Sequence, residues 1–327
     1  MSIAGTARKR LKRQVELLQS LGLKRIFLLL MIFNLLSRFW IAVIKSLRHV
    51  PVSVRSGLAA LLAFVFWLVI PKRRRVTLTN LRLCFPDKTE AERRQIAKSF
   101  YRKLMRAALD HGVLWAGSRD EVAAMVRFEG VENITETVAR GEHLIVISPH
   151  FVGLDAAGIG LNLHVRGCSL YQKQANPVWD EAALKGRLRF ANPELIAKHG
   201  RGDLKAVIRA MNKGLPFYYL PDMDHGRKNS IFIPFFGVPA ATVPMACRLA
   251  KLTRAKVCMC IAEMTDKGYV VHISPAWENY PTDDVEADTR RITAELENWI
   301  LKLPDQYLWS HRRFKTRPEG EPSVYED

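Results

Sequence analysis

Residues 143–155 read HLIVISPHFVGLD, and this stretch decides the fold. The apolar residues 144–147 are strand formers without alternation, which predicts a strand covered on both faces. Pro149 has no amide hydrogen to donate to a sheet, so the strand should end before it. Small residues after His150 suit a helix packed closely against the strand. We therefore expect an α/β fold that presents His150 at the end of a buried strand.

His150 and Asp155 form a candidate catalytic pair at that strand end. Positions five apart diverge on a regular helix, so the side chains can meet only if His150 precedes the first helical turn and Asp155 lies within it. The carboxylate would then accept a hydrogen bond from one ring nitrogen, and the other nitrogen could take a proton from a hydroxyl group. The same spacing also arises by chance, so the pair alone does not establish a general base.

Strands and helices alternate beyond this stretch. Strands are expected at residues 168–171, 215–220, 257–262 and 269–273, and helices at 178–190, 203–212, 243–252 and 285–303. The alternation predicts a mainly parallel sheet flanked by helices. A further helix should begin after Thr89, which forms a capping-box pattern with Glu92, and run to about Leu109. We divide the chain into an N-terminal unit, residues 1–72, and a catalytic domain, residues 73–327.

The N-terminal unit is basic and apolar. It begins with a basic arm, followed by apolar runs at residues 26–44 and 57–70, of which the first contains Asn34 and Arg38. Neither run has the uncharged length typical of a spanning helix. Basic clusters precede, separate and follow the two runs. If positive residues stay on the cytoplasmic side, this pattern favours helices lying in the membrane interface, with a single span as the alternative.

The net charge of +18 over 327 residues predicts a polyanionic partner. An anionic membrane surface or an acidic or phosphorylated partner would suit it, and a solvated basic surface is the alternative. The chain has no nucleic-acid-binding motif, so nucleic acid is not expected. Its five cysteines show no C-x-x-C spacing, and we expect neither a metal site nor a disulfide framework.

A second polar cluster follows the strand expected at residues 215–220. It reads PDMDHGRKNS over residues 221–230 and contains Asp224, His225 and Arg227. The aromatic side chains after it are Phe232, Phe235 and Phe236. This composition predicts a site for an amphipathic ligand, with polar groups for its head and aromatic side chains for its apolar chains. A loop attached to the core by its aromatic residues is the alternative.

Two arginines, Arg187 and Arg189, lie near the end of the helix expected at residues 178–190. Their planar guanidinium groups can bind phosphate through two parallel hydrogen bonds. They could equally be surface residues of that helix.

From about Arg73 to its end, the chain resembles the lipid A biosynthesis late acyltransferases of bacteria. The blocks that carry the resemblance are residues 80–86 (NLRLCFP), 150–155 (HFVGLD), 176–177 (NP), 186–189 (GRLR), 221–226 (PDMDHG), 232–237 (FIPFFG), 304–307 (PDQY) and 311–318 (HRRFKTRP). Many family members carry Glu where this chain has Asp155, and the shorter side chain leaves the subgroup open.

The resemblance implies that an acyl chain moves from acyl carrier protein to the hydroxyl of a 3-hydroxyacyl chain on a phosphorylated glycolipid. The reaction would take place at the cytoplasmic face of the bacterial inner membrane, without a metal or an organic cofactor. His150 would take the hydroxyl proton and Asp155 would orient His150. The expected substrate-binding residues are Arg187, Arg189, Asp224, His225 and Arg227.

Other functions must be weighed against this one. Glycerol-phosphate and lysophospholipid acyltransferases share the His-x4-Asp pair, but they usually carry an FPEGTR-type block where residues 220–226 read LPDMDHG. A thioesterase would release free fatty acid without an acceptor. A non-enzymatic basic membrane-surface protein would leave the His150 and Asp224 regions unexplained. For the mechanism we expect direct attack of the acceptor on the donor, because no Ser or Cys forms a recognisable nucleophile elbow beside His150.

Overall fold

The computed structural model describes residues 29, 31–198 and 202–325, which form an α/β fold around a seven-stranded sheet. The strand order is β1-β9-β8-β2-β5-β3-β4, and every neighbouring pair is parallel except β8 with β9. The strands are β1 (Val126–Glu129), β2 (Leu144–Ile147), β3 (Cys168–Tyr171), β4 (Glu194–Ala197), β5 (Phe217–Tyr219), β8 (Lys256–Met264) and β9 (Tyr269–Ile273). This architecture confirms the predicted fold class.

Strand β2 lies inside the sheet, between β8 and β5. All four of its side chains are buried, as predicted for a strand covered on both faces. Leu144 and Val146 pack into one apolar core, whereas Ile145 and Ile147 pack into the other. Strand pairing ends at Ser148, whose amide donates to the carbonyl of Tyr219 over 2.8 Å.

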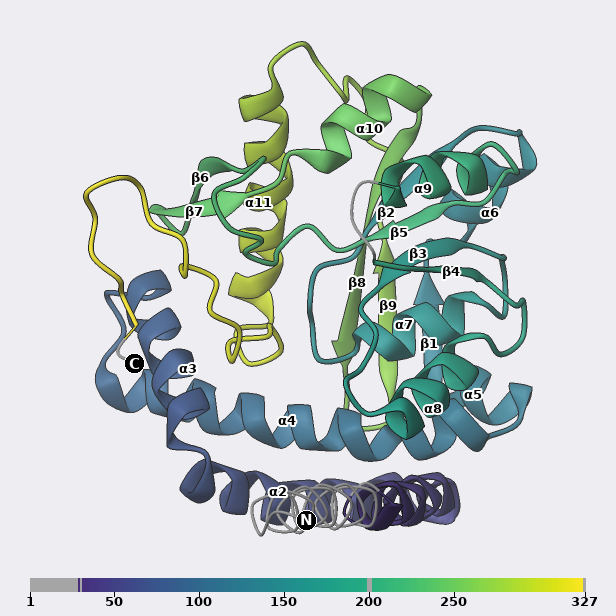
Figure 1. Cartoon of the computed structure of the whole chain (residues 1–327), viewed down its shortest axis with the longest axis vertical. Helices are drawn as coiled ribbons and strands as arrows, with labels where there is room; N and C mark the ends of the chain where they lie inside the picture. The colour runs from purple at the N-terminus through teal and green to yellow at the C-terminus, as the bar shows by residue number, and fades with distance from the viewer. Residues whose placement is uncertain (1–28, 30, 199–201, 326–327) are drawn as a thin grey trace, which may run out of the picture.

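Helices cover both faces of the sheet (Figure 1). They are α2 (Val52–Val69), α3 (Pro71–Cys84), α4 (Glu90–Ala116), α5 (Arg119–Met125), α6 (Glu132–Ala139), α7 (Leu154–Leu161), α8 (Pro177–Arg187), α9 (Asp203–Met211), α10 (Met245–Thr253) and α11 (Val285–Lys302). Buried residues of α9, α10 and α11 share the core of Ile145 and Ile147, and those of α5, α6 and α7 share the core of Leu144 and Val146. The hairpin of β6 (Ile231–Phe235) and β7 (Val238–Thr242) lies beside α11.

The predicted helices and strands are present, and several others were missed. The capping box of Thr89 and Glu92 starts α4 as expected, but the helix continues to Ala116 instead of ending near Leu109. Strands β1 and β4 were not predicted. Both are short, and none of the four residues of β4 is fully buried, so neither leaves a clear apolar pattern.

Two apolar helices lie along one side of the molecule, beyond α4 (Figure 1). Helix α2 is long and apolar enough to cross a membrane, and only 17% of that stretch is buried. Residues 31–46 are helical as well. Side chains more than half exposed on these helices include Phe33, Leu35, Phe39, Trp40, Leu61, Phe64 and Leu68. Such an apolar surface suits membrane association.

The basic arm and the start of the first apolar run lie outside the described residues. The interfacial orientation of the helices and the domain boundary at residue 72 stay predictions.

Helix α2 is attached to the protein core by a buried charge cluster. Arg55 Nε donates to Asp110 Oδ1 of α4 over 2.9 Å, and neither side chain is more than 6% exposed. Tyr269 of β9 donates to Asp110 Oδ2 over 2.8 Å. Arg106 adds a second cation, 3.4 Å from the same oxygen. Asp110 therefore joins three elements that are distant in the sequence.

Replacing Asp110 with Ala should lower the free energy of unfolding by about 3–5 kcal/mol, because Arg55 would remain buried without its counter-ion. Lys185→Ala is the control, since it removes an exposed ion pair with Glu181 and should cost less than about 1 kcal/mol. Urea unfolding followed by circular dichroism measures both. Equal, small losses would show that the buried cluster does not hold α2 in place.

Candidate active site

His150 follows the carboxyl end of β2 and is held there by Asp222. Asp222 Oδ1 lies 2.7 Å from His150 Nδ1, and Oδ2 accepts the backbone N–H of His150 over 2.9 Å. Asp222 follows β5, which pairs in parallel with β2, so the ends of the two strands meet at one edge. An ionised carboxylate can only accept hydrogen bonds, so Nδ1 carries the ring proton. In the neutral ring, Nε2 is then the nitrogen without a proton, and it has no hydrogen-bond partner within the described part of the chain.

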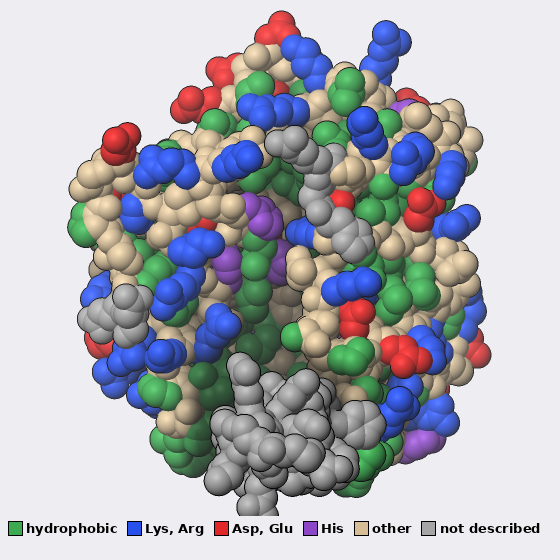
Figure 2. Space-filling model, viewed as in Figure 1, with side chains coloured by type: hydrophobic (Ala, Val, Ile, Leu, Met, Phe, Trp, Pro, Cys, Tyr) green, Lys and Arg blue, Asp and Glu red, His purple; other side chains and the backbone are tan. Residues whose placement is uncertain are grey.

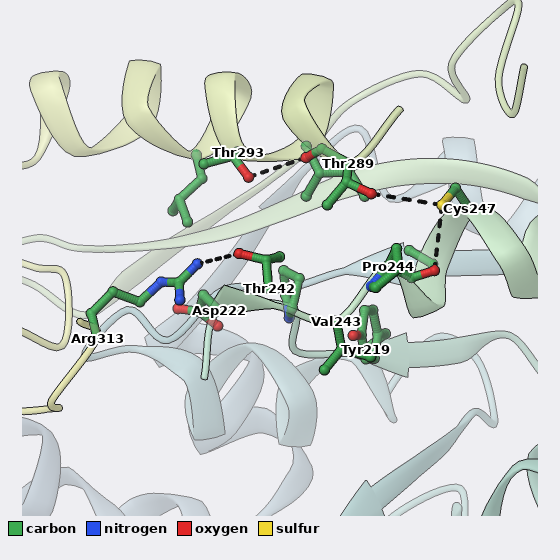
Figure 3. A pocket seen from close by; sticks show the side chains of 13 residues that line it. Tyr219, Asp222, Thr242, Val243, Pro244, Cys247, Thr289, Thr293 and Arg313 are labelled. Atoms are coloured by element: carbon green, nitrogen blue, oxygen red, sulfur yellow. Dashed lines mark hydrogen bonds between the residues drawn. The ribbon is translucent and has the colours of Figure 1, made fainter. Parts of the chain in front are cut away.

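The charge on Asp222 is stabilised from two sides. Asp222 is 3% exposed, and burial alone would raise the pKa of its carboxyl group, but His150 and Arg313 lower this pKa to about 2. Arg313 is itself buried, and its guanidinium donates to the Ala241 carbonyl over 2.8 Å and to Thr242 Oγ1 over 2.7 Å. Figure 3 shows Arg313 pointing toward Asp222 and Thr242 in a small pocket. Asp222 therefore remains an anion beside His150.

Asp155 has other partners than the one expected. Arg187 donates to both of its carboxylate oxygens, over 3.0 Å each. His111 Nε2 of α4 lies 3.0 Å from Oδ2. The predicted hydrogen bond from a ring nitrogen of His150 to Asp155 is therefore wrong, because Asp222 occupies Nδ1. His150 does precede α7, and Asp155 does lie in its first turn. Asp155 nevertheless contacts Arg187 of α8 and His111 of α4 instead of His150.

Asp155, Arg187 and His111 form a separate charged group, the Asp155 cluster, which does not include His150 or Asp222. Burial acts to raise the pKa of Asp155, but Arg187 and His111 outweigh it and hold this pKa well below its usual range. The charge of Asp155 raises the pKa of Arg187 in turn. One edge of the Arg187 guanidinium, formed by Nε and Nη2, thus donates to a carboxylate, and the binding of phosphate by Arg187 stays a prediction.

Three of the predicted substrate-binding residues lie outside the large cavity described below. Arg189 donates to the carbonyls of Leu114 and Gly117 at the end of α4. Asp224 is buried and accepts from the Thr316 amide over 2.7 Å and the Thr316 hydroxyl over 2.8 Å. These two residues therefore stabilise a helix end and attach the C-terminal segment.

The third residue, Arg227, is exposed and donates to the carbonyl of Arg317 over 2.8 Å. It lies above the ring of Phe232, with a separation of 5.8 Å from the ring centroid. Arg187 and His225, by contrast, both line the cavity.

Phe235 and Phe236, at the turn of the hairpin, pack into the core and do not line the cavity. Phe235 is fully buried, with its ring centroid 5.8 Å from that of Tyr307 and 6.0 Å from that of Phe314. Phe236 packs against Phe85 at 5.2 Å. Phe235 and Phe236 therefore fit the alternative of a loop attached to the core by its aromatic residues. Phe232 is only half-buried, and like the other two it does not line this cavity.

A large cavity of about 810 Å³ opens beside His150. Figure 2 shows the hollow, with histidine side chains on its wall, hydrophobic side chains below them and basic side chains around it. Its apolar walls include Val146, Leu154, Gly158, Ile159, Leu161, Leu170, Leu195, Phe217, Tyr218 and Leu220, and its polar residues include Asp155, Arg187, Lys198, His225, Lys228 and Asn229. Such a cavity suits an amphipathic ligand with a long apolar chain.

No group of three or more His, Cys, Asp or Glu suited to a metal ion occurs in the part of the chain that the structure describes. His150 lines the cavity together with Asp155, Arg187 and His225. A histidine held by a buried carboxylate beside an apolar cavity suits an enzyme that transfers a group with a long apolar chain.

Comparison with known proteins defines the family. The sequence model of the family of bacterial lipid A biosynthesis acyltransferases matches residues 27–316 of this chain. The chain belongs to this family, and the protein is an acyltransferase of lipid A biosynthesis.

Two curated relatives come from Escherichia coli K12. The chain is 30% identical to the lipid A biosynthesis lauroyltransferase over 88% of this chain and 95% of the relative. It is 33% identical to the lipid A biosynthesis palmitoleoyltransferase over 78% of this chain and 83% of the relative. Among solved structures, the 1-acyl-sn-glycerophosphate acyltransferase of Thermotoga maritima matches with a TM-score of 0.38 and 14% identity, over 78% of this chain and 99% of that one.

Sequence reasoning missed Asp222, His111 and Arg313. Asp222 has a usable signal, because it is the first carboxylate after a strand expected to lie in the same parallel sheet as residues 144–147. Carboxyl ends of parallel strands meet at one edge. His111 and Arg313 have no comparable signal, since they reach the site from an otherwise ordinary long helix and from a C-terminal loop.

The acid stability of the protein should depend on Asp222. Its folded pKa lies below the ordinary value of 3.8, so the ionised carboxylate stabilises the fold above about pH 4, and this contribution is lost as the pH falls to about 2. The difference in free energy of unfolding between wild type and Asp222→Asn should therefore shrink across that range in urea titrations. A difference that stays constant with pH would contradict the assignment.

Proposed function

We propose that the protein transfers a fatty acyl chain from acyl carrier protein to the hydroxyl of a 3-hydroxyacyl chain on a phosphorylated lipid A precursor. The observation that carries the proposal is the pair of His150 and Asp222 beside an apolar cavity that His150 lines, with Nδ1 engaged by Asp222. Membership of the lipid A acyltransferase family supports the choice of a lipid acceptor. The reaction takes place at the cytoplasmic face of the bacterial inner membrane, where the exposed apolar helices rest.

The chemistry begins at His150. The acceptor oxygen forms a bond with the thioester carbonyl carbon while its proton moves to Nε2. The carbon–sulfur bond then breaks and the departing sulfur takes that proton, so the products are an ester and a free thiol. Asp222 stabilises the imidazolium that forms between these steps, which is the usual role of a carboxylate behind a histidine base.

Asp155 acts on the same site indirectly. By accepting from Arg187 and His111, it fixes α7 against α8 and α4 beside the cavity. The Arg187 guanidinium then forms part of the cavity wall near the reacting groups. Asp155 and Arg187 are therefore positioning residues for the cavity, and His150 is the base.

The basic surface serves the two partners. Lys198, Lys228 and His225 line the polar part of the cavity, where they attract the acidic carrier protein and the phosphates of the acceptor. Arg227 and Arg189 lie outside this lining and contribute through loop and helix structure.

The test is mass spectrometry of a tetra-acylated lipid A precursor incubated with acyl carrier protein and the purified enzyme. Wild type should add one acyl group. His150→Ala should be slower by about 100- to 10,000-fold because the base is lost, and Asp222→Asn by about 1,000- to 10,000-fold because the tautomer is no longer fixed.

Asp283→Asn is the matched control, since it changes an aspartate that is 99% exposed, and it should leave the rate unchanged. Acylation of a lysophospholipid in place of the lipid A precursor would move the assignment to the glycerophospholipid class. Release of free fatty acid alone would indicate a thioesterase.

Transfer should occur directly, without an acyl-enzyme. Ser148 is the hydroxyl nearest to His150 in the sequence, but its Oγ donates to the Tyr218 hydroxyl over 2.5 Å. Incubation with loaded carrier protein, followed by acid quenching, should therefore leave the intact mass of the enzyme unchanged. An enzyme heavier by one acyl group, on the time scale of turnover, would establish a covalent intermediate.

A further inference from the structure

We infer that Gly158 sets the length of the donor acyl chain that the enzyme accepts. The inference rests on the proposed function, because it takes the chain in the cavity to be the one being transferred. Four observations carry it: the course of the cavity, the space beside Gly158, the fixed wall opposite it and the contrast with Gly160.

The cavity runs along the sheet from the reacting groups. His150 lies just beyond the carboxyl end of β2, whereas the lining residues Gly167, Pro193 and Pro216 immediately precede β3, β4 and β5. The chain of parallel pairings from β2 through β5 and β3 to β4 gives all four strands the same direction, so the three residues lie at the opposite ends of the strands from His150. At about 3.3 Å per residue, a four-residue strand separates the two edges by roughly 13 Å.

The donor chain is the natural occupant of this space. The carbon atom attacked in the reaction is the first atom of the donor acyl chain, so that chain must begin beside His150. A cavity that starts at His150 and runs away from it along the sheet has the course that such a chain requires.

Helix α7 forms one wall of the cavity. Leu154, Gly158 and Leu161 recur at helical spacing and all line it. A Cβ added at Gly158 would meet only Tyr218 Cε1, at 3.9 Å, which is an ordinary contact. A longer side chain at this position would therefore extend into open space that belongs to the cavity.

The wall opposite Gly158 is fixed. Tyr218 lies on β5, and its hydroxyl accepts a hydrogen bond from Ser148 Oγ over 2.5 Å. The side chain is thus held by the strand at one end and by this hydrogen bond at the other. A side chain introduced at position 158 cannot push the ring away easily, and the cavity would lose the corresponding volume.

Gly160, two residues further along α7, has a different reason to be glycine. A Cβ there would lie 2.8 Å from Val126 Cγ1 and 3.2 Å from two carbons of the Phe128 ring. Close packing against β1 thus excludes a side chain at Gly160, but no contact excludes one at Gly158. Glycine is unfavourable inside a helix. We therefore attribute the glycine at position 158 to the space that it leaves open in the cavity.

The experiment compares wild type with Gly158→Ala and Gly158→Leu. Each enzyme receives one lipid A precursor and a mixture of acyl carrier proteins loaded with saturated chains of graded length, and mass spectrometry gives the ratio of products. Leu should shift the ratio toward shorter chains, by about fourfold for every methylene that no longer fits. Ala should shift it in the same direction and less.

Gly57→Leu is the matched control, because Gly57 is also a helical glycine with nothing within 4 Å of an added Cβ and lies outside the cavity lining. It should keep the wild-type ratio. Thermal unfolding of each variant shows whether it is folded, and Gly158→Ala keeps the test valid if the larger variant does not fold.

An unchanged product ratio in a folded, active Gly158→Leu enzyme would overturn the inference while leaving the proposed function intact. If wild type transfers no chain from any carrier protein, the proposed function fails first and the inference fails with it.

Discussion

The hydrogen bond between His150 and Asp222 is the interaction on which the proposed chemistry of this protein depends. It forms because β2 and β5 are parallel neighbours, so that a histidine after one strand and an aspartate after the other meet at the same edge of the sheet. The aspartate is buried, yet His150 and Arg313 keep it charged. As a result, Nδ1 of His150 is engaged by Asp222, and Nε2 is the ring nitrogen that the proposed mechanism uses as the base.

Helix α4 links this site to the apolar helices on the surface. Its consecutive residues Asp110 and His111 have different partners: Asp110 binds Arg55 of α2, and His111 contacts Asp155 at the start of α7. The apolar helix α2 and the Asp155 cluster at the cavity wall are thus both attached to α4. Lipid chains arriving at the apolar side would meet a cavity whose position relative to that side is fixed.

Local patterns in the sequence were sufficient for the fold class, because unbroken apolar runs and their alternation with helices specify a parallel sheet. They also placed His150 correctly, since a proline ends the strand before it. The partner of His150 could not be read from spacing. Asp222 and Asp224 are separated by a single residue in an irregular loop, and Asp222 meets His150 whereas Asp224 binds Thr316. The assignment of Asp155 to His150 was wrong because the approach of Arg187 and His111 to Asp155 depends on tertiary packing, which spacing in the sequence does not reveal.

The tautomer of His150 tests the central claim most directly. Nitrogen-15 NMR of histidine-labelled protein should show His150 protonated at Nδ1 and free at Nε2, with a low-field Nδ1 proton that disappears in Asp222→Asn and persists in Asp155→Asn. A ring protonated at Nε2, or a low-field proton that is lost only when Asp155 is changed, would contradict the account and restore Asp155 as the partner of the base.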